Sequence, residues 1–196
     1  MISDILPRIL SELGLTVASP DISSNDTQMS QIRNLMTAAG KDICTRTQWE
    51  GCRATASIGN VSATSLPADF QEMAGTGTID INSGGDAIYP VTDFSLWAFL
   101  TKNTPAQPYY HIAGGSVNFI PDVPAAGATM VYISRNWVSG KDEVTDNADV
   151  PVFDEDLLQR GTVWRWKREK GLACQDLMAE FEADLEAAIQ ADRGAN

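Results

Sequence analysis

The hydrophobic period of this 196-residue chain changes twice, and this pattern limits the folds that it can adopt. Apolar residues recur at helical spacing up to about residue 50 and again from residue 153 onwards. Between these segments, residues 51–137 are rich in Gly, Ser, Thr, Val and Ile, with short runs that alternate as strands do. Helices and strands that are segregated along a chain in this way predict an α+β fold.

The first and last helical segments are expected to pack together. Ile and Leu residues predict a first helix that stops at Gly14, and a second apolar stripe predicts a helix from about Asp26 to Gln48. One long helix is predicted from residue 153 nearly to the end. We therefore predict a helical bundle domain of residues 1–50 plus 153–196, an inserted β-rich antiparallel domain of residues 51–137, and a solvated acidic connector of residues 138–152.

Two features of the β-rich segment have specific local signals. Gly114 and Gly115 predict the turn of a β-hairpin. Asp93 can cap a short helix in TDFSLWAFLTKN, and that helix is expected to bury Phe94, Trp97 and Leu100 or nearby side chains.

The segment VPVFDEDLLQRGTVWRWKREKGL, residues 150–172, begins acidic and ends basic. Asp154 is a good helix N-cap, and Phe153 and Leu158 stand where a hydrophobic staple needs them. The acids then lie at the positive end of the helix dipole and the bases near its negative end. Helix electrostatics therefore explain the charge order without a ligand.

The two tryptophans of this segment cannot face one core. Trp164 and Trp166 point about 200° apart on a helix. Trp164 belongs to the predicted core stripe, whereas Trp166 must pack elsewhere: in the same chain, or on another subunit. The predicted core stripe comprises Leu157, Trp164, Met178, Phe181 and Leu185.

Composition argues against several classes of function. The net charge of −12 repels phosphate backbones, so the run RWKREK is better interpreted as a solvated helix face than as a nucleic-acid site. His111 is the only histidine, three cysteines are scattered, and no catalytic, nucleotide-binding or calcium-loop motif occurs. We expect no cofactor, no metal and no membrane span, and we expect synthesis in the cytosol because no signal peptide is visible.

The order of several segments resembles the head-to-tail adaptor, or connector, proteins of tailed bacteriophages. These segments are a helix pair that ends near RTQW, then LPADF, then GGSVNFIP, then ISRNWV, then an acidic link into DVPVFDEDLLQRGTVWRWKREKGL. The tail tubular protein A of short-tailed phages, in the same portal-adaptor group, is similar in layout. The resemblance covers nearly the whole chain.

The resemblance implies a structural virion protein and not an enzyme. Such adaptors form a dodecameric ring beneath the portal in the virion neck, extend the DNA channel without binding DNA specifically, and offer a platform to the next neck or tail protein. Assembly would take place in the host cytoplasm. Because the C-terminal segment of the family tends to reach the portal, the candidate subunit or portal interface comprises Trp166, Ile189, Arg193 and Asn196.

Two other functions stay open on the residues alone. The chain could be a different neck component, such as a stopper or a tail terminator, which would bind tail protein instead of portal. It could also be a hydrolase that acts on the cell wall through a pair of acids in the β-rich segment, although no spacing among its 26 acids singles out such a pair.

Overall fold

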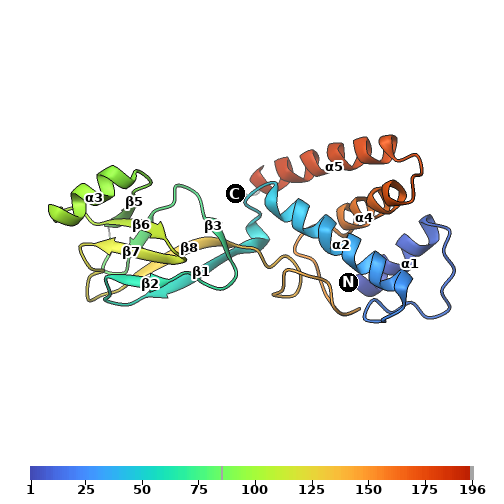
Figure 1. The fold of residues 1–196 in the computed structure, drawn as a ribbon, viewed down its shortest axis with the longest axis horizontal. Coiled ribbons are helices and arrows are strands. Elements are labelled where there is room, and N and C mark those ends of the chain that lie inside the picture. The colour runs from blue at the N-terminus through green and yellow to red at the C-terminus, as the bar shows by residue number, and fades with distance from the viewer. Residues whose placement is uncertain (85, 195–196) are drawn as a thin grey trace. The chain divides into compact units, whose positions relative to one another are not determined.

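A computed structural model describes residues 1–84 and 86–194 (Figure 1). In this part of the chain the fold is α+β, with five α-helices and a curled, mixed eight-stranded sheet. The α+β class predicted from the two changes of period is therefore confirmed. The chain divides into two compact units, one of Met1–Cys52 with Arg135–Asn196 and the other of Arg53–Ser134.

The first unit is helical, and α4 lies at its centre. This helix contacts α1, α2 and α5 (Figure 1). Ile2, Ile5 and Ile9 of α1 are fully buried, as are Ile32 and Met36 of α2. The elements are α1 (Ile2–Glu12), α2 (Thr27–Thr45), the 3-10 helix η1 (Glu50–Cys52), α4 (Glu155–Glu169) and α5 (Gln175–Gly194).

The single long helix predicted after residue 153 is wrong, because the chain turns at Gly171. This glycine has a φ of 70°, a conformation that ends helices. Its N–H donates to Arg168 O (3.1 Å), and the N–H of Leu172 donates to Lys167 O (2.9 Å). This pair of bonds is a Schellman motif, which closes α4 and lets α5 fold back beside it (Figure 1).

Trp137 fixes the packing of α2 in this unit. Its indole ring is fully buried, stacks on Phe153 (ring centroids 5.5 Å apart) and donates its Nε1–H to Asp142 O (3.0 Å). The ring lies directly against Gly40 of α2, where a Cβ atom would come within 2.2 Å of it. A residue without a side chain is therefore required at this point of α2.

The interpretation of residues 138–152 as a solvated connector is wrong for Asp149, which is 4% exposed. Its carboxylate accepts from the N–H groups of Thr145 (2.8 Å) and Asp146 (3.0 Å) and pairs with Lys141 Nζ (2.8 Å). Its carbonyl accepts from Ile2 N–H (2.8 Å). These bonds order the segment and join it to the start of α1, so the acid organises a loop instead of facing water.

The second unit is a sheet whose strands run in the order β1-β8-β4-β5-β6-β7-β2, with β3 also paired to β8. The predicted hairpin at Gly114–Gly115 is confirmed and joins β6 to β7. The strands are β1 (Arg53–Ile58), β2 (Ala63–Ser65), β3 (Phe70–Met73), β4 (Ile79–Ile81), β5 (Ala87–Pro90), β6 (Tyr109–Ala113), β7 (Ser116–Ile120) and β8 (Ala128–Ser134).

The sheet must curl because its two end strands are neighbours in sequence. Only residues 59–62 separate β1 from β2, and four residues span at most about 14 Å. The curled sheet encloses an apolar core in which Ile79, Val117, Phe119 and Met130 are at most 4% exposed. The two end strands therefore close around this core, β1 paired with β8 and β2 paired with β7.

The prediction that all strands are antiparallel is wrong at one place. β5 and β6 are parallel, with Tyr89 opposite Tyr109. Two parallel neighbours need a crossover connection, and α3 (Phe94–Lys102) provides it. The cap predicted for α3 is confirmed, because Asp93 Oδ1 accepts from the N–H groups of Ser95 (2.7 Å) and Leu96 (3.1 Å).

Candidate functional site

The start of α4 is built by the residues just before it. Asp154 is the N-cap, and its Oδ1 accepts from Asp156 N–H (2.8 Å). Phe153 and Leu158 are both buried, the former between the rings of Trp137 and Trp49. The direction of α4, and with it the position of its two tryptophans, is thus fixed at the N-terminal end.

Trp164 lies on the buried face of α4 and packs against α5. It is 6% exposed, with its ring centroid 6.2 Å from that of Phe181. Leu157 on α4 and Leu185 on α5 are buried as well. Four of the five residues proposed for the core stripe therefore lie inside the helical unit, although they belong to two helices instead of one.

Met178, the fifth residue of the predicted core stripe, is 41% exposed, so its predicted burial is wrong. It belongs to the first turn of α5, next to the turn between α4 and α5, where Leu172 is also 52% exposed. The reason is the helix break at Gly171. The stripe on α5 is therefore set by that helix alone: its buried residues Phe181, Leu185 and Ile189 are four apart, and the same spacing leads back to the half-buried Leu177 and not to Met178.

Arg165 is a buried cation that no sequence pattern singled out. It is 7% exposed, and its Nη2 pairs with Asp42 Oδ2 on α2 (2.6 Å) while Nη1 donates to Gly161 O (2.8 Å). Its guanidinium also lies 4.3 Å from the centroid of the Trp164 ring. Arg165 thus joins α4 to α2 and stacks on the core tryptophan.

Opposing effects set the charge states of this pair. Burial acts to raise the pKa of Asp42, but hydrogen bonding and charge from Arg46 and Arg165 outweigh it, so the pKa lies below its usual value. Burial lowers the pKa of Arg165, and Asp42 opposes that shift. An arginine keeps its proton throughout the working range of a protein, so the pair is ionic and structural.

Trp166 faces a different side of α4 from Trp164, as the 200° separation requires. It is only half-buried, and Lys170 Nζ lies 5.4 Å from its ring centroid. In the part of the chain that the structure describes, its buried Nε1–H meets no acceptor, and the same is true of the Nε1–H of Trp164. A buried donor of this kind is unusual in a native structure.

The basic residues that follow Trp166 are partly occupied within the chain. Lys170 Nζ donates to Gln31 Oε1 on α2 (2.9 Å), and the guanidinium of Arg168 lies 4.8 Å from the Trp164 ring centroid. Glu169 accepts from Gln31 Nε2 (2.8 Å). This arrangement favours the interpretation of RWKREK as a helix face over a site for nucleic acid.

The C-terminal candidates of the predicted interface differ in position. Ile189 is 7% exposed and shares the buried face of α5 with Phe181 and Leu185, so it is not available at the surface of the chain. The spacing of four residues between these three side chains is the reason. Arg193 is exposed. Asn196 lies outside the described residues.

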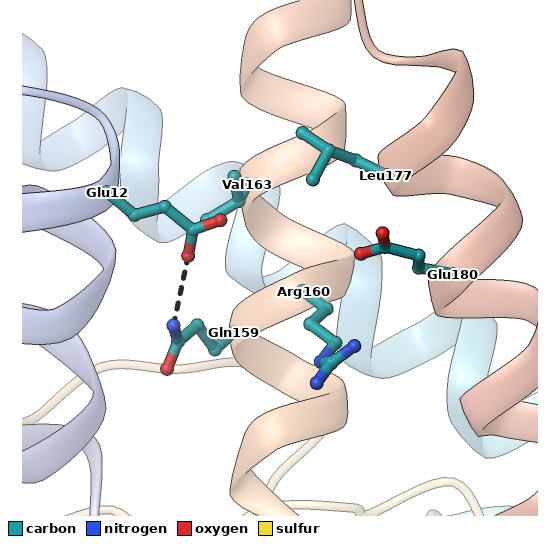
Figure 2. Close-up of a pocket in the computed structure, with 6 residues that line it drawn as sticks. All are labelled: Glu12, Gln159, Arg160, Val163, Leu177 and Glu180. Atoms are coloured by element: carbon teal, nitrogen blue, oxygen red, sulfur yellow. Dashed lines mark hydrogen bonds between the residues drawn. The ribbon is translucent and has the colours of Figure 1, made fainter.

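A pocket of about 240 Å³ opens between α1, α4 and α5 (Figure 2). Figure 2 shows Glu12 on α1 facing Gln159 on α4, whose Nε2 donates to Glu12 Oε2 (3.0 Å). Arg160 on α4 pairs with Asp184 on α5 (2.5 Å). The pocket is lined by Glu12, Gln159, Arg160, Val163, Leu177 and Glu180.

The lining of this pocket offers carboxylates and a guanidinium but no Ser, Cys or His that could act as a nucleophile with a base. Among residues 1–84 and 86–194, no three His, Cys, Asp or Glu side chains are grouped as metal ligands. The pocket lies where the surfaces of α1, α4 and α5 meet. No helix in the described ranges is long and apolar enough to cross a membrane.

The expected burial of Phe94 on α3 is wrong: its side chain is 74% exposed, and Phe99 is 59% exposed. Leu96 is 46% exposed, whereas Leu100 is buried and Trp97 is half-buried against His111 (ring centroids 5.3 Å apart). α3 covers the sheet with only one side, and its apolar residues continue around the helix. Ser95, Thr101 and Lys102 are its polar residues, so the exposed apolar surface of α3 is formed by Phe94, Leu96 and Phe99.

The family model described as SU10 adaptor protein matches residues 2–196, nearly the full length of the chain. No curated protein matches the chain.

Proposed function

The chain belongs to the SU10 adaptor protein family, a family of phage adaptors, and on this premise we propose that it joins the head of a tailed phage to its tail. We propose that copies of the chain form a ring, with twelve subunits, beneath the portal in the virion neck. The ring would extend the DNA channel and present a platform to the next neck or tail protein. It would assemble in the host cytoplasm.

The family match over residues 2–196 is the observation that carries this proposal. It includes both the helical unit and the curled sheet, so it extends well beyond one short motif. A structural adaptor acts by binding other proteins, and the proposal therefore depends on surfaces and not on a catalytic pocket.

The outer side of α3, formed by Phe94, Leu96 and Phe99, supports a binding role. These three side chains expose apolar surface that a protein partner could remove from water. Residues 53–134 hold only two of the chain's 14 basic and six of its 26 acidic residues. Because charged residues are depleted at the cores of protein interfaces, this unit is suited to contacts between copies that each carry a charge of −12.

The acidity of the whole chain is compatible with a channel for DNA. A wall of the same sign as the phosphates does not hold them, so the genome can slide. Arg193, exposed near the end of α5, and Trp166, half-buried on α4, are the described candidates that remain for contact with the portal or a neighbouring subunit.

The native mass of the purified protein, measured alone and after mixing with the portal ring of its own phage, tests the proposal. We expect a complex with the mass of the portal plus a ring of the adaptor. If both proteins are folded and no complex forms, the proposal that this chain binds the portal is wrong. A complex with an isolated tail protein instead would favour a stopper or a tail terminator.

A further inference from the structure

Two thiols lie next to each other where the chain leaves the helical unit. Cys44 belongs to the last turn of α2, and Cys52 ends η1, directly before β1. Their Sγ atoms are 3.7 Å apart, and each residue is 2% exposed. None of the three cysteines, all within the described residues, is in a disulfide.

The segment between the two cysteines is held in a fixed turn. Trp49 donates its Nε1–H to Ile43 O (2.8 Å), and Cys52 N–H donates to Trp49 O (3.0 Å). The Trp49 ring packs against Phe153, with centroids 5.9 Å apart. The backbone therefore places the two sulfur atoms together before any bond forms between them.

The two sulfur atoms are in non-bonded contact. A bond requires the sulfur atoms at about 2.05 Å, so the two atoms must approach by roughly 1.7 Å. Rotation about χ1 moves a sulfur atom on this scale while the backbone stays in place. Cys174, the third cysteine, lies after α4 near the turn into α5 and contributes nothing to this pair.

The contact between the thiols also makes them chemically unequal. A hydrogen bond from Cys52 lowers the pKa of Cys44, although burial opposes this shift. The hydrogen bond with Cys44, followed by burial, raises the pKa of Cys52. The hydrogen bond stabilises the thiolate of one sulfur while the other keeps its proton, so one thiol can attack an oxidant and its neighbour can resolve the reaction.

We propose that Cys44 and Cys52 are a site of covalent modification that closes to an intrachain disulfide when the protein meets a small-molecule disulfide such as oxidised glutathione. The Cys44 thiolate attacks one sulfur of the oxidant and releases one glutathione thiolate. The Cys52 sulfur then attacks the mixed disulfide, and the second glutathione leaves. Two protein thiols are oxidised, one glutathione disulfide is reduced to two thiols, and the two protons pass to these products.

Such a bond would join the last turn of α2 covalently to η1 within the helical unit. It would link Cys44, in the last turn of α2, to Cys52, the last residue of η1. The timing rests on the proposed function: a virion protein is made in a reducing cytosol and released into an oxidising medium. The thiols would then stay reduced during assembly and close after release.

The test uses the full-length chain with Cys174→Ser, which removes the third thiol. The reduced protein is equilibrated with oxidised glutathione, with and without sub-denaturing urea to allow local opening, then denatured in acid and alkylated. We expect the loss of two alkylatable thiols, a mass lower by two hydrogens, and a peptide in which residues 44 and 52 are linked. We also expect Tm to rise by roughly 5 °C, the order of magnitude for closing a short loop in a chain of this length.

The matched control adds Cys52→Ser and should show only a glutathione adduct on Cys44. The proposal is overturned if both thiols remain alkylatable after equilibration with urea present, or if the products are mixed disulfides or dimers linked between chains. Because the assay uses the isolated protein, its result does not depend on the adaptor role. The native-mass experiment with the portal can therefore fail while the thiol oxidation assay succeeds, and the oxidation assay can fail while the native-mass experiment succeeds.

Discussion

At the scale of single residues, Gly40 is the position in α2 that tolerates a side chain least. A Cβ atom there would stand 2.2 Å from the Trp137 ring, which is itself fully buried. Alanine is the better helix former by about 1 kcal/mol, so propensity alone predicts that Gly40→Ala stabilises the protein. We predict the opposite, a loss of about 3 kcal/mol in the free energy of unfolding measured in urea, because the core must deform.

Two further variants test the cause of the loss expected for Gly40→Ala. At Gly194 a Cβ atom would meet nothing within 4 Å, so Gly194→Ala should leave stability nearly unchanged. Adding Trp137→Phe to Gly40→Ala removes the ring atoms that clash, and the double-mutant cycle should show strong coupling. Additive effects would mean that the Trp137 ring does not lie on Gly40.

Asp149 is the residue whose charge we expect to shape the acid stability of the protein. Burial acts to raise its pKa, but the Lys141 ammonium and the N–H groups of Thr145 and Asp146 outweigh burial and hold the pKa below its usual value. The native state therefore binds fewer protons than the unfolded state just below pH 4. The stability that Asp149 contributes is fully present above the usual carboxyl range and is lost as the pH falls through it.

Asp149→Asn should consequently lower the free energy of unfolding at pH 7 by about 2 kcal/mol and flatten its decline between pH 5 and pH 3. Urea unfolding at a series of pH values measures both effects. Asp142→Asn is the matched control, because its ion pair with Lys41 (3.3 Å) is exposed on both sides and should contribute less than about 1 kcal/mol. Equal pH profiles for wild type and Asp149→Asn would contradict the role assigned to this carboxylate.

At the scale of elements, Gly171 decides between a helical hairpin and one long helix. Its φ of 70° is unfavourable for any residue with a Cβ atom, and nothing lies within 4 Å to clash, so the cost of alanine is purely a backbone cost. We predict that Gly171→Ala destabilises the protein by about 1 kcal/mol in urea unfolding. A stabilisation of similar size would instead indicate a continuous helix from α4 into α5.

Local signals were the part of this fold that could be predicted from sequence. The cap of α3 at Asp93 and the hairpin at Gly114–Gly115 depend on neighbours within a few residues, and both are present. The break at Gly171 was missed because apolar residues on both sides of it continue a period of seven, although the glycine itself is a recognised stop signal.

Long-range pairing was the part that could not be predicted. The partner of Arg165 is Asp42, 123 residues away, and the partner of Gly40 is Trp137. No local pattern contains such pairs. The parallel pairing of β5 with β6 was missed for the same reason. A nine-residue helix between two short strands is equally compatible with antiparallel strands.

α3 gives a prediction in which stability and assembly should separate. Because Phe94 and Phe99 are mostly exposed, the double change Phe94→Ser and Phe99→Ser should alter the free energy of unfolding by less than about 1 kcal/mol. It should nevertheless weaken the complex with the portal, or the ring itself, in native mass measurements. Leu100→Ala on the buried side of α3 is the control and should cost about 2 kcal/mol or more in stability. Full assembly by the double variant would show that this surface is not used.

At the scale of the whole molecule, α4 holds two tryptophans that we expect to serve different purposes. Trp164 is 6% exposed and packs on Phe181 and Arg165, so Trp164→Ala should lower the free energy of unfolding by about 3–5 kcal/mol. Trp166 is only half-buried, so its removal should cost the isolated protein much less.

If Trp166 contacts a neighbouring subunit or the portal, Trp166→Ala should reduce the amount of portal-bound ring in native mass spectra while the isolated protein stays folded. The comparison is made at a temperature where the Trp164→Ala chain is still folded, so that both variants enter the assembly reaction intact. Trp164→Ala should then assemble nearly as well as wild type, because its defect lies inside the helical unit. Equal losses of stability and assembly in the Trp166→Ala chain would place Trp166 in the core of the subunit, and the search for the interface would turn to α3 and Arg193.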